Sequence, residues 1–409
     1  MLKGPRMTEF YRLYSSLPIQ EPPRAVAEID LSALRHNYRY LRAEAERSSP
    51  DSRPICVVKA DAYGHGAPAC VRVLLEEGCD FFAVSCLNEA VAVREVCRSE
   101  GKEASILILG YTDPSLARSL AEEDLIQTLV SAEYADRLLS AALGEGVSVR
   151  VHAAVDTGMN RIGFPAQDFR SVRDTVKRLA AMTRQRTLRL EGVFSHLAAA
   201  DEPMGSRGEA LTHKQVERFR AVCAGLEAET DTPLFYHLCN SAGTLRLPKD
   251  LLDGYRLGIL LYGAHPSSDF SLPVRSVMRL VTRIAHIHTL PAGESVSYGG
   301  TFTADRTLRV ATLPIGYADG LLRAFSGGTV TVRTKNGDVR VPVIGRICMD
   351  QCMIDVTDTD ACEGDEVVLF GEDPQQLADY AARASTIDYE CLCLVSARIL
   401  RVYTDGERT

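Results

Sequence analysis

One lysine of this sequence stands where a reactive group could be built. Lys59 follows the apolar run 54–58 and precedes a turn-rich segment with Gly64 and Gly66. Residues that follow the strands of an α/β barrel line its active site. Lysine also forms Schiff bases with carbonyl cofactors such as pyridoxal phosphate. For this residue alone, a solvated lysine at a strand end is the plainer interpretation. The choice between the two interpretations therefore needs the residues that follow the other apolar runs.

Further polar residues follow later apolar runs. His196 ends the sixth run, Ser241 follows the seventh, and Arg256 opens the eighth, which also contains Gly258. Barrel phosphate sites are commonly built from the loops after the seventh and eighth strands. Ser241 offers a hydroxyl, and a glycine lets an oxyanion approach backbone N–H groups closely. With Lys59, these residues predict a phosphate cup and a Schiff-base lysine in one pocket.

The elements that must position these residues alternate between short apolar runs and amphipathic stretches. Helical patterns cover 31–41, 88–97 and 212–226. Continuous apolar strands are typical of parallel sheets buried on both faces, and eight of them predict a (β/α)8 barrel. A doubly wound open sheet is the alternative, but no GxGxxG follows the first run. The eight predicted strands are 55–58, 81–84, 106–109, 125–130, 147–155, 188–194, 234–239 and 257–261.

After about residue 274 the pattern changes to short β-type runs separated by turn signals. Asn336-Gly337 between two such runs predicts a hairpin. We therefore predict three parts: an N-terminal leader over 1–23, a barrel domain over 24–273 and a mostly β domain over 274–409. The β-type runs are 277–290, 308–313, 329–334, 339–344 and 366–370.

Composition excludes several classes of protein. The chain has 46 Lys and Arg against 54 Asp and Glu, a net charge of −8, which disfavours nucleic-acid binding. No apolar run could span a bilayer, and residues 1–21 lack the apolar stretch of a secretory signal. The twelve cysteines form no CxxC pair, so no metal site is predicted. Free thiols such as Cys239 and Cys348, interpreted as packing residues, fit a reducing cytoplasm.

From about Arg24 to Tyr403 the chain resembles the alanine racemases. The resemblance implies a (β/α)8 barrel followed by a β domain, pyridoxal 5'-phosphate as cofactor, and a homodimer. It agrees with the fold predicted from the strand pattern. The segments that carry it are 57–66, 156–163, 239–242, 256–263, 296–299, 316–320 and 345–351.

The resemblance implies that two bases move the α-proton, one on each face of the substrate. Lys59 is one base. Tyr298 is the other and comes from the partner subunit. His196 and Arg256 occupy positions that lower the pKa of this tyrosine, which is ordinarily near 10. The residues implied in cofactor binding are Lys59, Tyr63, His196, Ser241, Arg256, Gly258, Ile259 and Tyr389.

The resemblance also places Arg256 against the pyridine nitrogen of the cofactor. Arginine essentially never gives up its proton, so that nitrogen stays unprotonated and the cofactor is a weaker electron sink. A weak sink favours simple proton return over transamination. It argues against a basic amino acid decarboxylase, which needs an acidic partner at this nitrogen.

Substrate binding is implied for Arg161, which orients the substrate carboxylate, and for Met349. Tyr317 and Tyr389 narrow the entrance, while Arg323, Arg346 and Asp201 match outer positions of the access channel. Two residues depart from the family pattern. Ala154 replaces a lysine, often carbamylated, that supports Arg161 in many relatives, so we expect chloride or another small anion near Arg161. Leu257 replaces a proline, with only a local backbone effect.

We therefore predict an isomerase that interconverts L-alanine and D-alanine and supplies D-alanine for peptidoglycan. A racemase for serine or a broader set of small amino acids is the alternative within the family. Keeping Tyr389 at the substrate face favours a small side chain. A non-catalytic single-barrel protein that binds the cofactor is a third possibility, and the β domain with Tyr298 argues against it.

Overall fold

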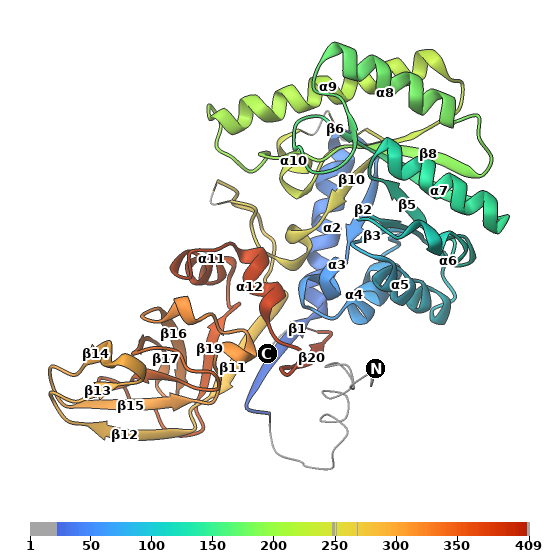
Figure 1. The fold of residues 1–409 in the computed structure, drawn as a ribbon. Coiled ribbons are helices and arrows are strands. Elements are labelled where there is room, and N and C mark those ends of the chain that lie inside the picture. The colour runs from blue at the N-terminus through green and yellow to red at the C-terminus, as the bar shows by residue number, and fades with distance from the viewer. Residues whose placement is uncertain (1–22, 248–249, 251, 268, 407–409) are drawn as a thin grey trace. The chain divides into compact units, whose positions relative to one another are not determined.

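The computed structural model describes residues 23–247, 250, 252–267 and 269–406. All but the last residue of the predicted leader lies outside them. Contacts group the described chain into two units (Figure 1). One is Leu34–Val274; the other joins the residues up to Ala33 with those from Arg275 onward.

The first unit contains eight parallel strands that close into a barrel, because β5 pairs with β6 as well as with β4. This confirms the predicted barrel and excludes the open sheet. The short strand β7 (Phe164–Pro165) extends β6. The barrel strands are β2 (Arg53–Val57), β3 (Phe81–Val84), β4 (Ser105–Ile108), β5 (Ile126–Leu129), β6 (Val149–Asp156), β8 (Leu188–Phe194), β9 (Phe235–His237) and β10 (Gly254–Leu257).

Helices lie between these strands, and the sequence fixes where several begin. Asp168 and Ser171 form a capping box at α8, and Ser131 and Ser206 cap α7 and α9. Such caps satisfy backbone N–H groups that have no partner within the helix. The helices are α2 (Leu31–Ser48), α4 (Ala67–Glu76), α5 (Leu87–Ser99), α6 (Ala117–Glu122), α7 (Ala132–Glu145), α8 (Phe169–Met182), α9 (Arg207–Glu229) and α10 (Ser241–Arg246).

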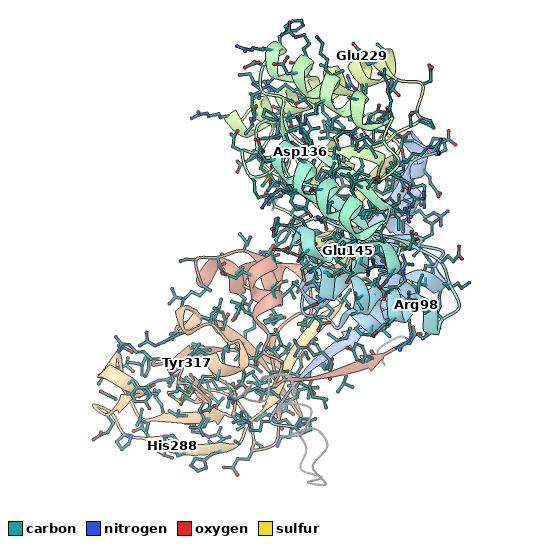
Figure 2. The ribbon with its side chains drawn as sticks, turned by 45° about the vertical axis from the view of Figure 1, so that its right-hand side comes forward. Arg98, Asp136, Glu145, Glu229, His288 and Tyr317 are labelled. Carbon is teal, nitrogen blue, oxygen red and sulfur yellow. The ribbon has the colours of Figure 1, made fainter. Side chains whose placement is uncertain are left out.

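Arg98 and Asp136, labelled in Figure 2, each pair with a charged side chain of a neighbouring helical segment. Arg98 pairs with Glu123 at 2.8 Å, and Asp136 of α7 pairs with Arg178 of α8 at 2.6 Å. These pairs lie at the surface, where each contributes little to stability. Burial of the apolar strands is therefore the main support of the barrel.

The eighth predicted strand had the wrong bounds. The strand ends at Leu257, and Ile259–Tyr262 forms a 3-10 helix, η3, that is almost fully buried. A buried apolar turn has the same hydrophobic pattern as a buried strand. Arg256 therefore lies near the end of β10 rather than at its start, and Gly258 and Ile259 follow the strand.

The second unit is built on a nine-stranded sheet, in the order β12-β15-β18-β17-β16-β19-β11-β1-β20. β16 and β17 pair antiparallel across Asn336, which confirms the predicted hairpin. The strands are β1 (Ala25–Asp30), β11 (Met278–Arg283), β12 (His286–Leu290), β15 (Leu308–Leu313), β16 (Thr329–Thr334), β17 (Gly337–Ile344), β18 (Cys352–Asp355), β19 (Glu366–Phe370) and β20 (Leu400–Thr404).

Two features of this unit differ from the predicted pattern. The run 277–290 forms two strands, β11 and β12, because it breaks after Arg283. β1 pairs with β11 and β20, so it groups with the β unit, whereas we expected residues from 24 onward to belong with the barrel.

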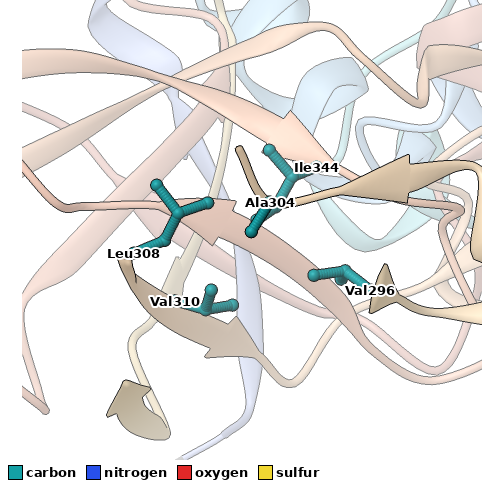
Figure 3. Close-up of a cluster of buried hydrophobic side chains, with 5 residues drawn as sticks. All are labelled: Val296, Ala304, Leu308, Val310 and Ile344. Carbon is teal, nitrogen blue, oxygen red and sulfur yellow. The ribbon is translucent and has the colours of Figure 1, made fainter. Parts of the chain in front are cut away.

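A small apolar cluster holds the hairpin of β13 (Ser295–Val296) and β14 (Phe302–Thr303) (Figure 3). Tyr298 lies between these two strands. The cluster therefore anchors the segment that presents this tyrosine. Its buried members are Val296, Ala304, Leu308, Val310 and Ile344.

Across the described residues, every helix is too short or too polar to cross a membrane.

Candidate functional site

Lys59 opens an unusual left-handed turn. The four residues after it, Ala60 to Tyr63, all have φ of 53–54°, and Gly64 follows at 82°. The Gly64 N–H donates to the Ala60 carbonyl at 2.9 Å. Left-handed backbone costs a non-glycine residue about 1–2 kcal/mol. Four in succession persist only where surrounding contacts hold them.

A carboxylate from α5 supplies such contacts. Glu89 accepts the Ala60 N–H at 2.8 Å with one oxygen and the Ser85 N–H at 2.7 Å with the other. Asp61 accepts the Ala67 N–H at 2.7 Å. Glu89 thus joins the chain after β2 to the chain after β3 and fixes the backbone at Lys59. Sequence reasoning missed Glu89; its signal was an acid in the first turn of a helix.

Tyr63, Ser241 and Gly258 converge beside this turn. The Gly258 N–H donates to Ser241 Oγ at 2.9 Å. A Cβ built on Gly258 would lie 2.8 Å from Tyr63 Oη and 3.7 Å from Ser241 Oγ. Gly258 also caps the N-terminus of η3, where the first backbone N–H groups have no partner within the helix. Hydroxyls and N–H groups around a space that only glycine leaves open fit a phosphate group.

Arg256 lies in the barrel interior and is almost fully buried. Its guanidinium donates to His237 Nδ1 at 2.7 Å and His196 Nδ1 at 3.2 Å. It also donates to the carbonyls of Ser195 at 2.7 Å and Leu238 at 2.8 Å. A guanidinium has no acceptor, so both imidazole nitrogens must accept and both rings carry their proton on Nε2.

The electrostatics of this cluster favour neutral imidazoles beside a charged arginine. Burial, then the positive charges of Arg256, Arg161 and Lys59, lowers the pKa of His196 well below its usual value. Burial lowers the pKa of Arg256 to about 10, so it stays protonated at neutral pH. His237 Nε2 in turn lies 3.1 Å from His152 Nδ1. Positive charges from three side chains therefore act on the ring of His196, which suits an anionic ligand.

Arg161 lies on an exposed loop after β6. Asp156 shapes this loop by accepting the N–H groups of Gly158 and Asn160, both at 3.0 Å. Ala154, on β6, is buried and pairs with Phe194 of β8. Asp201 is half-buried further along the chain after β8.

The β unit carries a second cluster of predicted residues. Tyr298 follows Ser297, which has φ of 66° and donates through Oγ to the Arg346 carbonyl at 2.6 Å. The Tyr317 N–H donates to the Cys348 carbonyl at 3.0 Å, one residue before Met349. The segments of Tyr298, Arg346, Met349 and Tyr317 therefore meet in this unit.

A buried ion pair supports the Tyr317 loop, and sequence reasoning missed it. Asp319, almost fully buried, lies 2.7 Å from Arg398 and accepts the Gly316 N–H at 2.9 Å. Arg398 also pairs with Asp350 at 2.7 Å. The only sequence signal was the position of Asp319 inside the motif 316–320.

The remaining predicted residues, Arg323 and Tyr389, belong to the same unit. Arg323 is exposed. Ser326 Oγ donates to the Arg323 carbonyl at 2.7 Å and accepts the Ile347 N–H at 3.1 Å. Tyr389 is half-buried on α12 (Asp388–Leu394). Each unit thus gathers its own set of predicted residues. Within the described residues, no group of three or more His, Cys, Asp or Glu could hold a metal ion.

Comparisons with known proteins agree on one family. Residues 29–266 match the model "Alanine racemase, N-terminal domain", and residues 277–403 match "Alanine racemase, C-terminal domain". Alanine racemase 1 of Clostridium acetobutylicum is 39% identical over 384 residues, which cover 92% of this chain and 94% of the relative. Alanine racemase of Desulfovibrio desulfuricans is 40% identical, covering 93% and 98%.

Solved structures give the same result. Alanine racemase from Clostridium difficile 630 has a TM-score of 0.83 at 34% identity, covering 95% of this chain and 97% of that one. Alanine racemase from D-cycloserine-producing Streptomyces lavendulae has a TM-score of 0.83 at 35% identity, covering 95% and 99%.

Proposed function

The chain belongs to the alanine racemase family, and from this premise we propose how its residues carry out the reaction. Its activity is the pyridoxal-phosphate-dependent racemisation of alanine. The cofactor's phosphate would fit the cradle of Tyr63, Ser241 and Gly258, with the backbone of Ile259, the first residue of η3, beside it. Lys59 would hold its carbonyl carbon, and Tyr389 would support the phosphate.

When bound, pyridoxal phosphate draws electrons from the substrate Cα and makes its proton acidic. Arg256 would face the ring nitrogen of the bound cofactor, and it keeps its own protons because burial lowers its pKa only to about 10. It therefore limits how strongly electrons are withdrawn. Weaker electron withdrawal would favour return of the proton over other reactions. The buried Arg256 among neutral partners is the observation that carries this proposal.

Two side chains move the proton. Lys59 Nζ takes or returns it on one face of the substrate, and Tyr298 Oη acts on the other. Arg161 and the Met349 backbone bind the substrate carboxylate, which fixes Cα between the two bases. Because Ala154 offers no polar group, a chloride ion beside Arg161 balances its charge in this proposal.

A second copy of the chain supplies the tyrosine. In the single chain, Tyr298 is 71% exposed, Met349 53% and Ile387 61%. The segments of Tyr298 and Met349 lie together, since Ser297 Oγ is 3.4 Å from Cys348 Sγ, and grouped exposed apolar side chains are typical of protein interfaces. We infer a homodimer in which Tyr298 of each copy completes the site of the other.

Tyr317 and Tyr389 narrow the entrance, and Arg323, Arg346 and Asp201 line its outer part. A narrow entrance selects a small side chain, so alanine is preferred over serine. The product D-alanine would serve peptidoglycan synthesis in the cytoplasm.

A panel of L-amino acids tests this proposal. The purified protein loaded with pyridoxal phosphate should racemise alanine with the highest kcat/KM and serine more slowly. Equal or higher kcat/KM for serine would favour the broader small-amino-acid racemase. No racemisation of any amino acid would contradict the proposal.

A further inference from the structure

Two side chains of helix α9, Gln215 and Arg218, contact the chain at the ends of β6 and β8. Gln215 is fully buried. Its Nε2 donates to Thr157 Oγ1 at 3.2 Å and to the His196 carbonyl at 2.9 Å. Its Oε1 accepts the Ala198 N–H at 2.8 Å. One amide thus ties the chain after β6 to the chain after β8.

Arg218 lies one helical turn further along α9 and binds the loop that runs from Thr157 to Arg161. Its Nη1 donates to the Thr157 carbonyl at 2.7 Å. Gly158 follows with φ of 141°, and a Cβ there would lie 3.1 Å from Arg218 Nη1 and 3.6 Å from Gln215 Cγ. The loop therefore packs directly on these two side chains, and a Cβ at Gly158 would have to displace the end of Arg218.

Thr157 is also tied to β8. Its Oγ1 lies 2.8 Å from Ser195 Oγ, which donates to the Val155 carbonyl at 2.7 Å. Asp156 joins Gly158 and Asn160 to the same turn. Displacing Thr157 would therefore displace the turn that leads into Arg161.

We propose that Gln215 and Arg218 are positioning residues for Arg161. They fix the Arg161 loop relative to the strand end that carries His196. This inference rests on the proposed role of Arg161 in binding the substrate carboxylate. Ala154 has only a methyl side chain and adds no polar side-chain contact to this loop.

The test measures carboxylate binding apart from turnover. Propionate, a carboxylate without an amino group, is titrated into the holoenzyme while the absorbance of the bound cofactor is followed. Hydrogen exchange of residues 156–163 is measured on the same samples. The variants are Gln215→Met and Arg218→Met, with Arg218→Lys as the conservative change. Glu217→Met, at an exposed position of α9, is the matched control.

Gln215→Met and Arg218→Met should raise the propionate Kd and the alanine KM about 5-fold or more, as expected for a lost buried hydrogen bond. They should also speed exchange over 156–163, while kcat changes much less than KM. Arg218→Lys should recover most of the affinity. Since Arg218 is only half-buried, its variants should fold even where Gln215→Met does not.

The inference would be overturned if Gln215→Met and Arg218→Met bound propionate and exchanged hydrogen as Glu217→Met does. It would also be overturned if these two variants lowered only kcat. Arg161→Lys serves as the reference. If Arg161→Lys leaves propionate binding unchanged, the proposed role of Arg161 fails and the inference falls with it. If only the α9 variants leave it unchanged, the inference alone fails.

Discussion

At the scale of single residues, Lys59 is the side chain on which the proposed chemistry depends most. Reduction of the holoenzyme with borohydride should fix the cofactor to one lysine, because reduction makes the lysine–cofactor bond irreversible. Peptide mapping by mass spectrometry should find the label on the peptide that contains Lys59. A label on any other lysine would remove Lys59 from the site.

Ala154 gives a second prediction at this scale. In the proposed site, bound substrate and cofactor would cover the Arg161 guanidinium, so its charge would need a balancing group, and alanine cannot supply one. Racemisation should therefore rise with chloride more than with a bulky anion at matched ionic strength, where screening is equal.

Bromide in place of chloride should give an anomalous diffraction peak beside Arg161. Equal rates in both salts, together with no peak, would show that the loop works without an anion.

At the scale of elements, the barrel places polar groups at strand ends and helices hold them there. Glu89 of α5 does this for Lys59. A hydrogen bond to a charged group contributes about 1.5–3 kcal/mol, comparable to the cost of one or two left-handed residues. Glu89→Gln should therefore loosen the turn, speed hydrogen exchange over 59–66 and reduce kcat/KM about 10-fold or more.

Glu95→Gln is the control for this prediction, because Glu95 lies on the same helix at an exposed position. If Glu89→Gln and Glu95→Gln have the same hydrogen-exchange rates and the same kcat/KM for alanine, the left-handed turn is stable without Glu89. Glu89 then has no positioning role.

Strand ends were predictable from the sequence where apolar runs end in polar residues, as at Lys59 and His196. The left-handed turn was not, because Ala60, Asp61 and Ala62 carry no signal for positive φ. The last barrel strand was misplaced since η3 is as apolar as a strand. Glu89 and Gln215 are ordinary polar residues on helices, and their partners become visible only once the strand ends are brought together.

At the scale of the whole molecule, the proposed site needs two copies of the chain. Homodimers of Lys59→Ala and of Tyr298→Ala should both be inactive. A heterodimer of the two variants should regain one complete site, since one chain supplies the lysine and the other the tyrosine. Activity should approach half that of the unaltered dimer. Inactive heterodimers, with assembly proven by tagged purification, would place both bases in one chain.

The central claim is that two bases act on opposite faces of the substrate, and α-proton exchange in D2O tests it most directly. In Tyr298→Phe, racemisation should fall by about 10² or more. Exchange should continue from the enantiomer that Lys59 deprotonates and collapse from the other. Small, equal losses from L-alanine and D-alanine would contradict the two-base account.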